Sequence, residues 1–275
     1  MTLKNPLLFL SLAGLAAAES FPVTIRVDVD RPGAELKPIW RFFGADEPNY
    51  ATMKHGDELL GHLGSLKPKQ VFFRAHSLLV TGDGTPALKW GSTNAYTEDQ
   101  PYFAGFRSLA TNGIDKQVLN VFRMFSKMDG QRLPVSSDAA VSLPDLLRSG
   151  VRGKPDVSAL AAMNGKKLTV LVWHYHDDDV RGPDAEVRID LLGAPQGVPK
   201  VTRHLVDETH SNSFTAWLAM GSPQKPTAEQ IAELEQACKL APVDEQARFI
   251  EEENLSAVMV TLARQGVTLL EMEWE

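Results

Sequence analysis

Four polar residues in the N-terminal third of the chain have side chains that could take part in catalysis or bind a ligand. Asp46 and Glu47 follow a short apolar stretch, and Arg74 and His76 stand two positions apart at the end of another. Carboxyl groups can act as general acids or bases. In an extended strand Arg74 and His76 point to the same side, where a cation and an imidazole could contact a polar ligand. All four residues are therefore candidates for substrate binding.

Each pair also has a purely structural interpretation. Acidic residues at 46–47, followed by Asn49, would stabilise the start of a helix, because acids favour the positive end of the helix dipole and Asn can cap it. Arg74 and His76 could instead form an ion pair at the rim of a sheet. The spacing alone leaves these alternatives open.

No metal or cofactor is expected from the remaining motifs. His174 and His176 share a strand face with acids beyond them, but zinc sites need three or four converging ligands, and the run at 177–179 is typical of a solvated turn. Gly82 and Gly84 lack the Lys and helix start of a phosphate-binding loop. Cys238 is the only cysteine, which excludes an intrachain disulfide.

The elements that would position the four candidates form a strand–helix–strand unit. Residues 39–45 are short and apolar on both faces, 50–66 carry apolar residues near a 3.6-residue period, and 71–76 form a second short strand. This spacing is typical of the βαβ unit of a parallel sheet or barrel. A further helix is expected at 115–128, whereas 77–106 show little periodicity.

The C-terminal half is expected to be β-structure. An additional strand at 21–30 alternates strictly between apolar and polar residues and is free to join it. Asn164-Gly165 is a signal for a tight hairpin. An amphipathic helix at 227–240, with Thr227 and Gln230 spaced as a capping box, makes Cys238 a small buried apolar residue rather than a nucleophile. The predicted strands are 156–163, 167–176, 185–192, 200–206, 257–262 and 266–273, which together predict an antiparallel sandwich.

The N-terminal segment and the net charge indicate where the protein is located. Residues 1–18 combine a basic start, an apolar run and a small-residue end, which predicts a signal peptide and a secreted or periplasmic protein. An uncleaved N-terminal anchor is the alternative. The net charge of −7 and the pI of about 5.6 argue against binding to nucleic acid, and against membrane association once the signal is cleaved.

Longer strings resemble glycoside hydrolase family 39, whose members are β-xylosidase-like. In the first part these are WRFFGADEPNY at 40–50, FRAH at 73–76 and TGDGTPALKWGSTN at 81–94. In the second part they are QPYFAGF at 100–106, NVFRMFSK at 120–127 and VWHYHDDD at 172–179. Glu47 before Pro48 is similar to the Asn-Glu-Pro acid/base motif of retaining glycosidases. Asp46, however, replaces the Asn of that motif, and Glu47 follows the first strand rather than the fourth.

The resemblance implies a (β/α)8 barrel followed by a C-terminal β-sandwich. It also implies retaining hydrolysis of a xylo-oligosaccharide or another glycoside. A whole barrel takes roughly 250 residues, yet only 39–130 remain for it here. The family's acid/base and nucleophile motifs are both absent, and the two halves of the resemblance meet at 98–100. We therefore expect 1–18 to be a signal peptide, 19–38 a strand segment that joins the sandwich, 39–130 a barrel remnant and 131–275 the sandwich.

Three expectations for function follow. The chain has no catalytic residues of its own and is inactive alone, with Asp46, Glu47, Arg74 and His76 as remaining substrate-binding candidates. The first alternative is a non-catalytic carbohydrate-binding sandwich. The second is an unstable product of a deleted or mis-joined gene, because a lone βαβ fragment buries too little apolar surface to offset its ordering entropy. The oligomeric state stays open.

Overall fold

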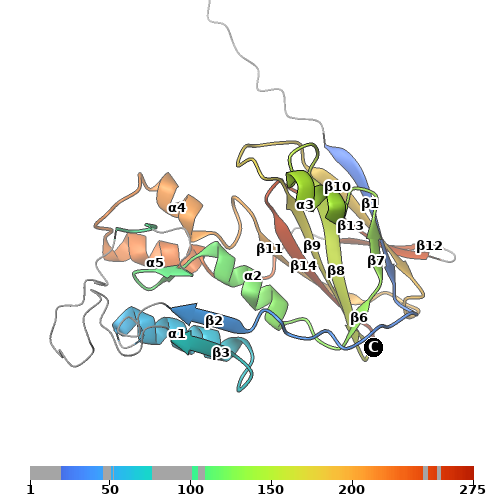
Figure 1. Ribbon diagram of the computed structural model, residues 1–275, viewed down its shortest axis with the longest axis horizontal. Coiled ribbons are helices and arrows are strands. Elements are labelled where there is room, and N and C mark those ends of the chain that lie inside the picture. Colours follow the sequence, from blue (N-terminus) through green and yellow to red (C-terminus); the bar gives the residue numbers. More distant parts are fainter. Residues whose placement is uncertain are drawn as a thin grey trace, which may run out of the picture.

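The structure is a computed structural model that describes residues 20–45, 51, 53–75, 101–104, 109–243, 247–252 and 255–275. Two five-stranded sheets lie face to face at one side of the molecule, and most of the helices gather with two small sheets at the other (Figure 1). The predicted signal peptide at 1–18 and the 98–100 junction lie outside the described residues. Within those residues, no helix is long and apolar enough to cross a membrane.

The two large sheets, A and B, divide the β-strands between them. Sheet A has the order β12-β13-β10-β1-β7, with bounds Arg248–Glu252, Leu255–Leu262, Ala185–Leu192, Phe21–Asp28 and Val135–Ser137. Sheet B has the order β11-β14-β9-β8-β6, with bounds Lys200–Val206, Val267–Glu273, Lys167–Tyr175, Asp156–Asn164 and Gln131–Leu133. The predicted strands at 185–192 and 200–206 are confirmed to the residue.

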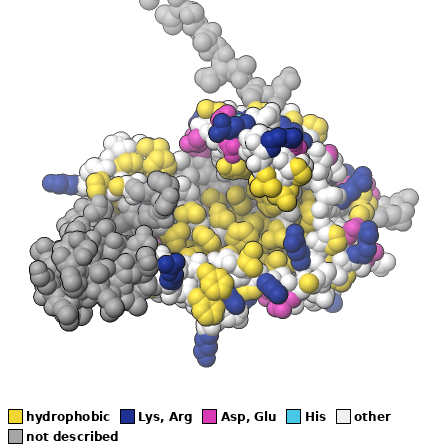
Figure 2. Space-filling view, in the orientation of Figure 1, with side chains coloured by type: hydrophobic (Ala, Val, Ile, Leu, Met, Phe, Trp, Pro, Cys, Tyr) yellow, Lys and Arg dark blue, Asp and Glu magenta, His cyan; other side chains and the backbone are white. Residues whose placement is uncertain are grey.

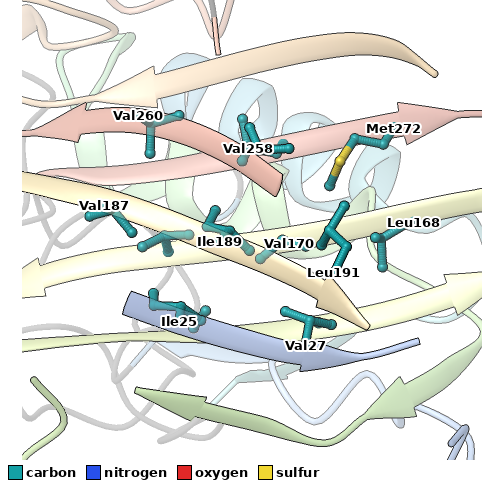
Figure 3. Close-up of a cluster of buried hydrophobic side chains, with 14 of the residues drawn as sticks. Ile25, Val27, Leu168, Val170, Val187, Ile189, Leu191, Val258, Val260 and Met272 are labelled. Carbon is teal, nitrogen blue, oxygen red and sulfur yellow. The ribbon is translucent and has the colours of Figure 1, made fainter. Parts of the chain in front are cut away.

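Alternate residues of both sheets meet in one apolar core. Strands of sheet A contribute Ile25, Val27, Val187, Ile189, Leu191, Val258 and Val260, and strands of sheet B contribute Leu168, Val170 and Met272 (Figure 3). All ten are buried. The alternation in the sequence therefore has its expected cause, because in a strand every second side chain faces the opposite sheet.

The N-terminal strand β1 joins sheet A as expected, but one of its two neighbours in the sheet runs parallel to it. β1 runs parallel to β10 over eight residue pairs, from Phe21↔Ala185 to Asp28↔Leu192, and antiparallel to β7. The expectation of an antiparallel sandwich is wrong at this pair. Residues 29–184 separate the two strands, so no short hairpin fixes their relative direction.

The predicted hairpin at Asn164-Gly165 is confirmed between β8 and β9. Asn164 pairs with Lys167, which leaves Gly165 and Lys166 as the two loop residues. Gly165 has a φ of +59°, and Lys166 is not among the residues with positive φ. A positive φ at the first loop position alone is the pattern of a type II′ turn, in which Gly is favoured there.

The strand–helix–strand unit is confirmed as β2 (Phe42–Ala45), α1 (Lys54–Leu66) and β3 (Phe72–Ala75). β2 and β3 are parallel, and Leu63 and Leu66 of α1 pack against Leu119 of α2 (Gln117–Ser126). Among the described residues, β2 and β3 pair only with each other. They form an open two-stranded sheet, and no closed barrel is seen in this part of the chain.

Several short elements were not expected from the sequence. The pair β4 (Ala110–Thr111) and β5 (Ile114–Asp115) turns at Asn112-Gly113, both with positive φ, so the helix expected from 115 begins two residues later. Three further helices are α3 (Leu143–Ser149), α4 (Ser213–Ala219) and α5 (Ala228–Ala237). Of these only α5 was expected, and its capping box between Thr227 and Gln230 is confirmed.

The packing of β1 generates the first prediction. Ile25 is fully buried in the shared core, whereas Ile39 is 83% exposed. We expect Ile25→Ala to lower the free energy of unfolding by about 2–5 kcal/mol, the usual cost of a cavity left by a truncated core residue. Ile39→Ala is the matched control and should change it by no more than about 0.5 kcal/mol. Urea denaturation measures both, and equal effects would show that β1 does not belong to the core.

Candidate functional site

The structure places one of the four candidate residues. Arg74 lies in β3 opposite Gly44 of β2, and its side chain is exposed. Asp46, Glu47 and His76 lie outside the described residues. Asp46 and His76 directly follow Ala45 and Ala75, the last residue pair of the two parallel strands. The grouping of the candidates at this edge therefore stays a prediction.

The exposed face of this small sheet is aromatic rather than polar. Phe42 and Phe72 stack with their ring centroids 5.2 Å apart and are 63% and 51% exposed. The Arg41 guanidinium lies 5.5 Å and 5.1 Å from the two ring centroids. Such a cation over aromatic faces is a favourable contact. The guanidinium therefore lies over two aromatic rings that remain exposed.

A buried polar network connects the helices around β5. Asp115 is 6% exposed, and its carboxylate oxygens lie 2.5 Å from Nη2 of Arg123 and 3.2 Å from Nδ1 of His62. Nη1 of Arg123 donates to Oδ1 of Asn120 at 2.7 Å. Ser213 donates its hydroxyl to the backbone carbonyl of Asp115 at 2.7 Å. A buried carboxylate satisfied in this way joins α1, α2 and α4 to one strand.

Asn120 extends this network to α5. Its side chain is fully buried, and its amide nitrogen donates to the carbonyl oxygens of Ser211 and Cys238 at 2.9 Å and 2.7 Å. The carbonyl of Cys238 stands at the end of α5, where carbonyl groups have no partner within the helix, and Asn120 satisfies it. The network is structural, because its polar atoms are already paired with one another.

A second cluster joins α2 to sheet B through Glu271 of β14. Glu271 is 8% exposed and accepts from Nε2 of His204 at 2.9 Å, from Nζ of Lys167 at 2.5 Å and from Nζ of Lys127 at 3.1 Å. The hydrogen bond from His204 is the largest cause that holds the pKa of Glu271 far below its usual range, and both lysines add to it. The carboxylate therefore stays ionised and is a poor general acid.

The histidine-rich end of β9 is structural. His174 and His176 are both buried; Nδ1 of His174 lies 3.0 Å from the carbonyl oxygen of Leu262, and Nε2 of His176 lies 3.1 Å from that of Arg152. Burial lowers the pKa of His174. Asp177 accepts from the backbone N–H of Val151 at 3.0 Å. Within the described part of the chain, no three His, Cys, Asp or Glu side chains gather in a way that could hold a metal ion.

Cys238 is buried at the end of α5, as the sequence predicts. Its thiol donates to the carbonyl oxygen of Glu235 at 3.2 Å. Burial is the largest cause that raises the pKa of the Cys238 thiol. A protonated, buried thiol is a weak nucleophile, so Cys238 is a packing residue.

The outer face of sheet B, which points away from sheet A, is hollowed next to α2. This hollow, the sheet-B groove, measures about 820 Å³ and is lined by residues 33–37 with Ile39, by residues 132–135, by 158–160 and by Trp173. Figure 2 shows apolar side chains gathered in a hollow on this side of the molecule. A second hollow of about 240 Å³ is also lined by Trp173, together with Leu146 of α3 and Tyr175.

Sequence reasoning missed the two charged clusters. Asp115 was expected in the first turn of a helix, where an acid is usually solvated, and nothing local marks it as buried. Glu271 carried a usable signal, because it interrupts the apolar run from Leu269 to Met272 in a strand with two buried faces. A charge in such a strand needs partners. Those partners, from β9, β11 and α2, are distant in sequence.

The chain matches a protein-family model and known proteins over part of their length. The model of glycosyl hydrolases family 39 matches residues 90–254, which is more than half of the chain. A β-xylosidase of Caldicellulosiruptor saccharolyticus is 26% identical over 156 residues, a match that covers 55% of this chain and 29% of that protein.

Two solved structures are among those that match this chain. The GH39 enzyme from Xanthomonas axonopodis pv. citri matches with a TM-score of 0.50 and 18% identity, covering 80% of this chain and 40% of that one. A monomeric β-xylosidase from Caulobacter crescentus CB15 matches with a TM-score of 0.48 and 16% identity, covering 77% and 39%. The chain thus spans less than half the length of these relatives.

The Glu271 cluster generates a prediction about pH. A carboxyl group whose pKa is lowered in the folded state stabilises the fold above its unfolded pKa of about 4.3, and this contribution is lost as the pH falls below that value. We expect Glu271→Gln to cost about 1–3 kcal/mol at pH 7, because charged hydrogen bonds are lost. The variant should also lose less stability than the parent between about pH 5 and pH 3.

Glu273→Gln is the control for this experiment. The Glu273 side chain is 57% exposed, and its carboxylate lies 3.8 Å from Nζ of Lys167, a long distance for an ion pair. Chemical denaturation at each pH gives the stability of the three proteins. Parallel stability profiles for the parent and Glu271→Gln would contradict the assignment.

Proposed function

The chain belongs to glycosyl hydrolase family 39, and from this premise we propose that it derives from a retaining β-xylosidase but does not hydrolyse glycosides alone. Retaining hydrolysis needs two carboxyl groups about 5–5.5 Å apart on either side of the scissile bond. The sequence contains no Asn-Glu-Pro, the acid/base motif, and the proposal takes the nucleophile motif to be missing with it. The proposed ligand class is a xylo-oligosaccharide or a similar glycoside.

The observation that carries the proposal is the open sheet formed by β2 and β3. Arg74, the one described candidate, is exposed on it, and the neighbouring surface consists of stacked phenylalanines. Ligand sites in enzymes are usually concave and bury most of the ligand. A barrel provides such a site at the carboxyl ends of several strands, whereas two strands provide only one short edge.

The remaining parts of the proposal rest on the sequence. By the family resemblance, Asp46, Arg74 and His76 are proposed to correspond to positions that line the sugar site in an intact relative. Glu47 is a further substrate-binding candidate because of its place beside them. Export through the N-terminal segment would place the protein outside the cytoplasm, either secreted or in a periplasm.

The proposal predicts no glycosidase activity. The purified full chain, incubated with an aryl β-xyloside, should release the phenol no faster than buffer does. Sustained turnover that co-purifies with the chain and falls in Arg74→Ala would contradict the proposal. Saturable binding of xylo-oligosaccharides without turnover would favour the non-catalytic carbohydrate-binding alternative, provided that it survives mutation of His76.

A second prediction concerns how the chain comes apart. The β2–α1–β3 unit has a small core, but α2 packs on sheet B through Met124 and Met128, and Lys127 pairs with Glu271. Limited proteolysis should therefore cut before about residue 109 and leave α2 attached to the sandwich. Mass spectrometry of the resistant fragment measures its first residue. A fragment that begins after Met128 would show that α2 separates with the βαβ unit.

A further inference from the structure

Helix α3 presents an apolar surface that nothing in the described part of the chain covers. Leu143, Leu146 and Leu147 are 66%, 42% and 77% exposed. Leu143 and Leu147 stand one helical turn apart, so they share a face. Three neighbouring exposed leucines on one short helix are unusual for a surface that stays in water.

The helix itself is well formed. Ser142 caps its N-terminus by accepting from the backbone N–H of Asp145 at 3.2 Å, and Arg148 pairs with Asp145. At its end, the backbone N–H of Val151 donates to Asp177. Because Val151 is 2% exposed, α3 is anchored where it lies. The exposed leucines therefore belong to a fixed helix.

The sheet-B groove is the complementary feature. Its floor is largely apolar, with Leu160 and Trp173 from the outer face of sheet B and Val135 from β7. The neighbouring part of the same face is already covered by a helix, since Met124 of α2 and Met128, just after its end, pack there on Leu171 and Leu269. The uncovered part thus continues a surface on which this fold packs a helix.

Both features lie on the same side of the molecule. Trp173 lines the sheet-B groove and also the smaller hollow that Leu146 of α3 lines. This surface carries exposed leucines on a helix and an apolar groove beside them. Two copies of such a surface can therefore bind each other. In a two-fold dimer each helix enters the groove of the other copy, and both contacts form at once.

We propose that a second copy of this chain occupies the groove, with Leu143 and Leu147 of α3 inserted. The charged residues at the rim of the groove are compatible with a second copy of the chain as its ligand. Lys37 and Arg132 border the groove together with Glu35, and all three are exposed. The helix carries Asp145 and Arg148 beside its leucines. These two residues pair with each other and, being exposed, can also meet the charges that border the groove of a second copy.

The test is the oligomeric state of the full chain in solution. Sedimentation velocity over roughly 1–100 µM, the range of modest interfaces, should show a species of about twice 30.2 kDa that grows with concentration. Leu147→Asp should weaken self-association at least ten-fold, because it puts a charge into the apolar contact. Leu218→Asp on α4, where Leu218 is 48% exposed, is the matched control and should leave it unchanged.

A mixing experiment separates the proposed contact from other ways of associating. Ser158→Glu puts a charge on the groove floor and leaves α3 intact, whereas Leu147→Asp leaves the groove intact. Each variant alone should associate at least ten-fold more weakly than the parent. Their mixture retains one of the two contacts and should associate more strongly than either variant alone. Circular dichroism checks that both variants fold. A monomeric parent, association that survives Leu147→Asp, or a mixture that behaves as its components would overturn the proposal.

Discussion

The shared core of sheets A and B is the constraint on which the rest of the molecule depends. Each sheet has one face that must leave water, and each supplies the cover for the other. β1 is part of this arrangement although it comes first in the chain, since Val23, Ile25 and Val27 are buried between the sheets. The outer face of sheet B then serves as a platform, where α2 is held by apolar contacts and by the Glu271 cluster.

The βαβ unit lacks such mutual cover. Parallel sheets are normally buried on both faces, because the helices that connect their strands pack against them. Here α1 covers one side of β2 and β3, and the other side shows Phe42 and Phe72 to water under a single arginine. The unit contacts α2 through Leu119 and Phe122, and His62 of α1 contacts Asp115. It is thus a dependent structure, in contrast to the sandwich.

Periodicity predicted those elements whose cause is local. The seven longer strands of the sandwich, the turn at Gly165 and the cap at Thr227 follow from neighbouring residues, and they are confirmed. The short strands β6, β7 and β12 were not predicted. The direction of β1 beside β10 could not be predicted, because it depends on contacts across more than 150 intervening residues. The Asn112-Gly113 turn follows from residue type, because Asn-Gly favours a tight turn, although 107–114 belongs to no element that the sequence predicts. Of the candidate site, only the parallel pairing that aligns the ends of β2 and β3 is established by the structure.

Family membership and catalytic chemistry rest on different parts of this chain. The matched residues, 90–254, contain most of the sandwich, whereas Asp46, Glu47, Arg74 and His76 all precede them. Strands β8 to β11 and helix α2 lie within the match, and their residues contribute to the core, to the outer face of sheet B and to the partners of Asp115 and Glu271. A match to such residues transfers a fold, because burial and pairing are what they provide. Hydrolysis depends on a suitably placed pair of carboxyl groups, so the family name describes the descent of the sandwich and leaves the chemistry to be measured.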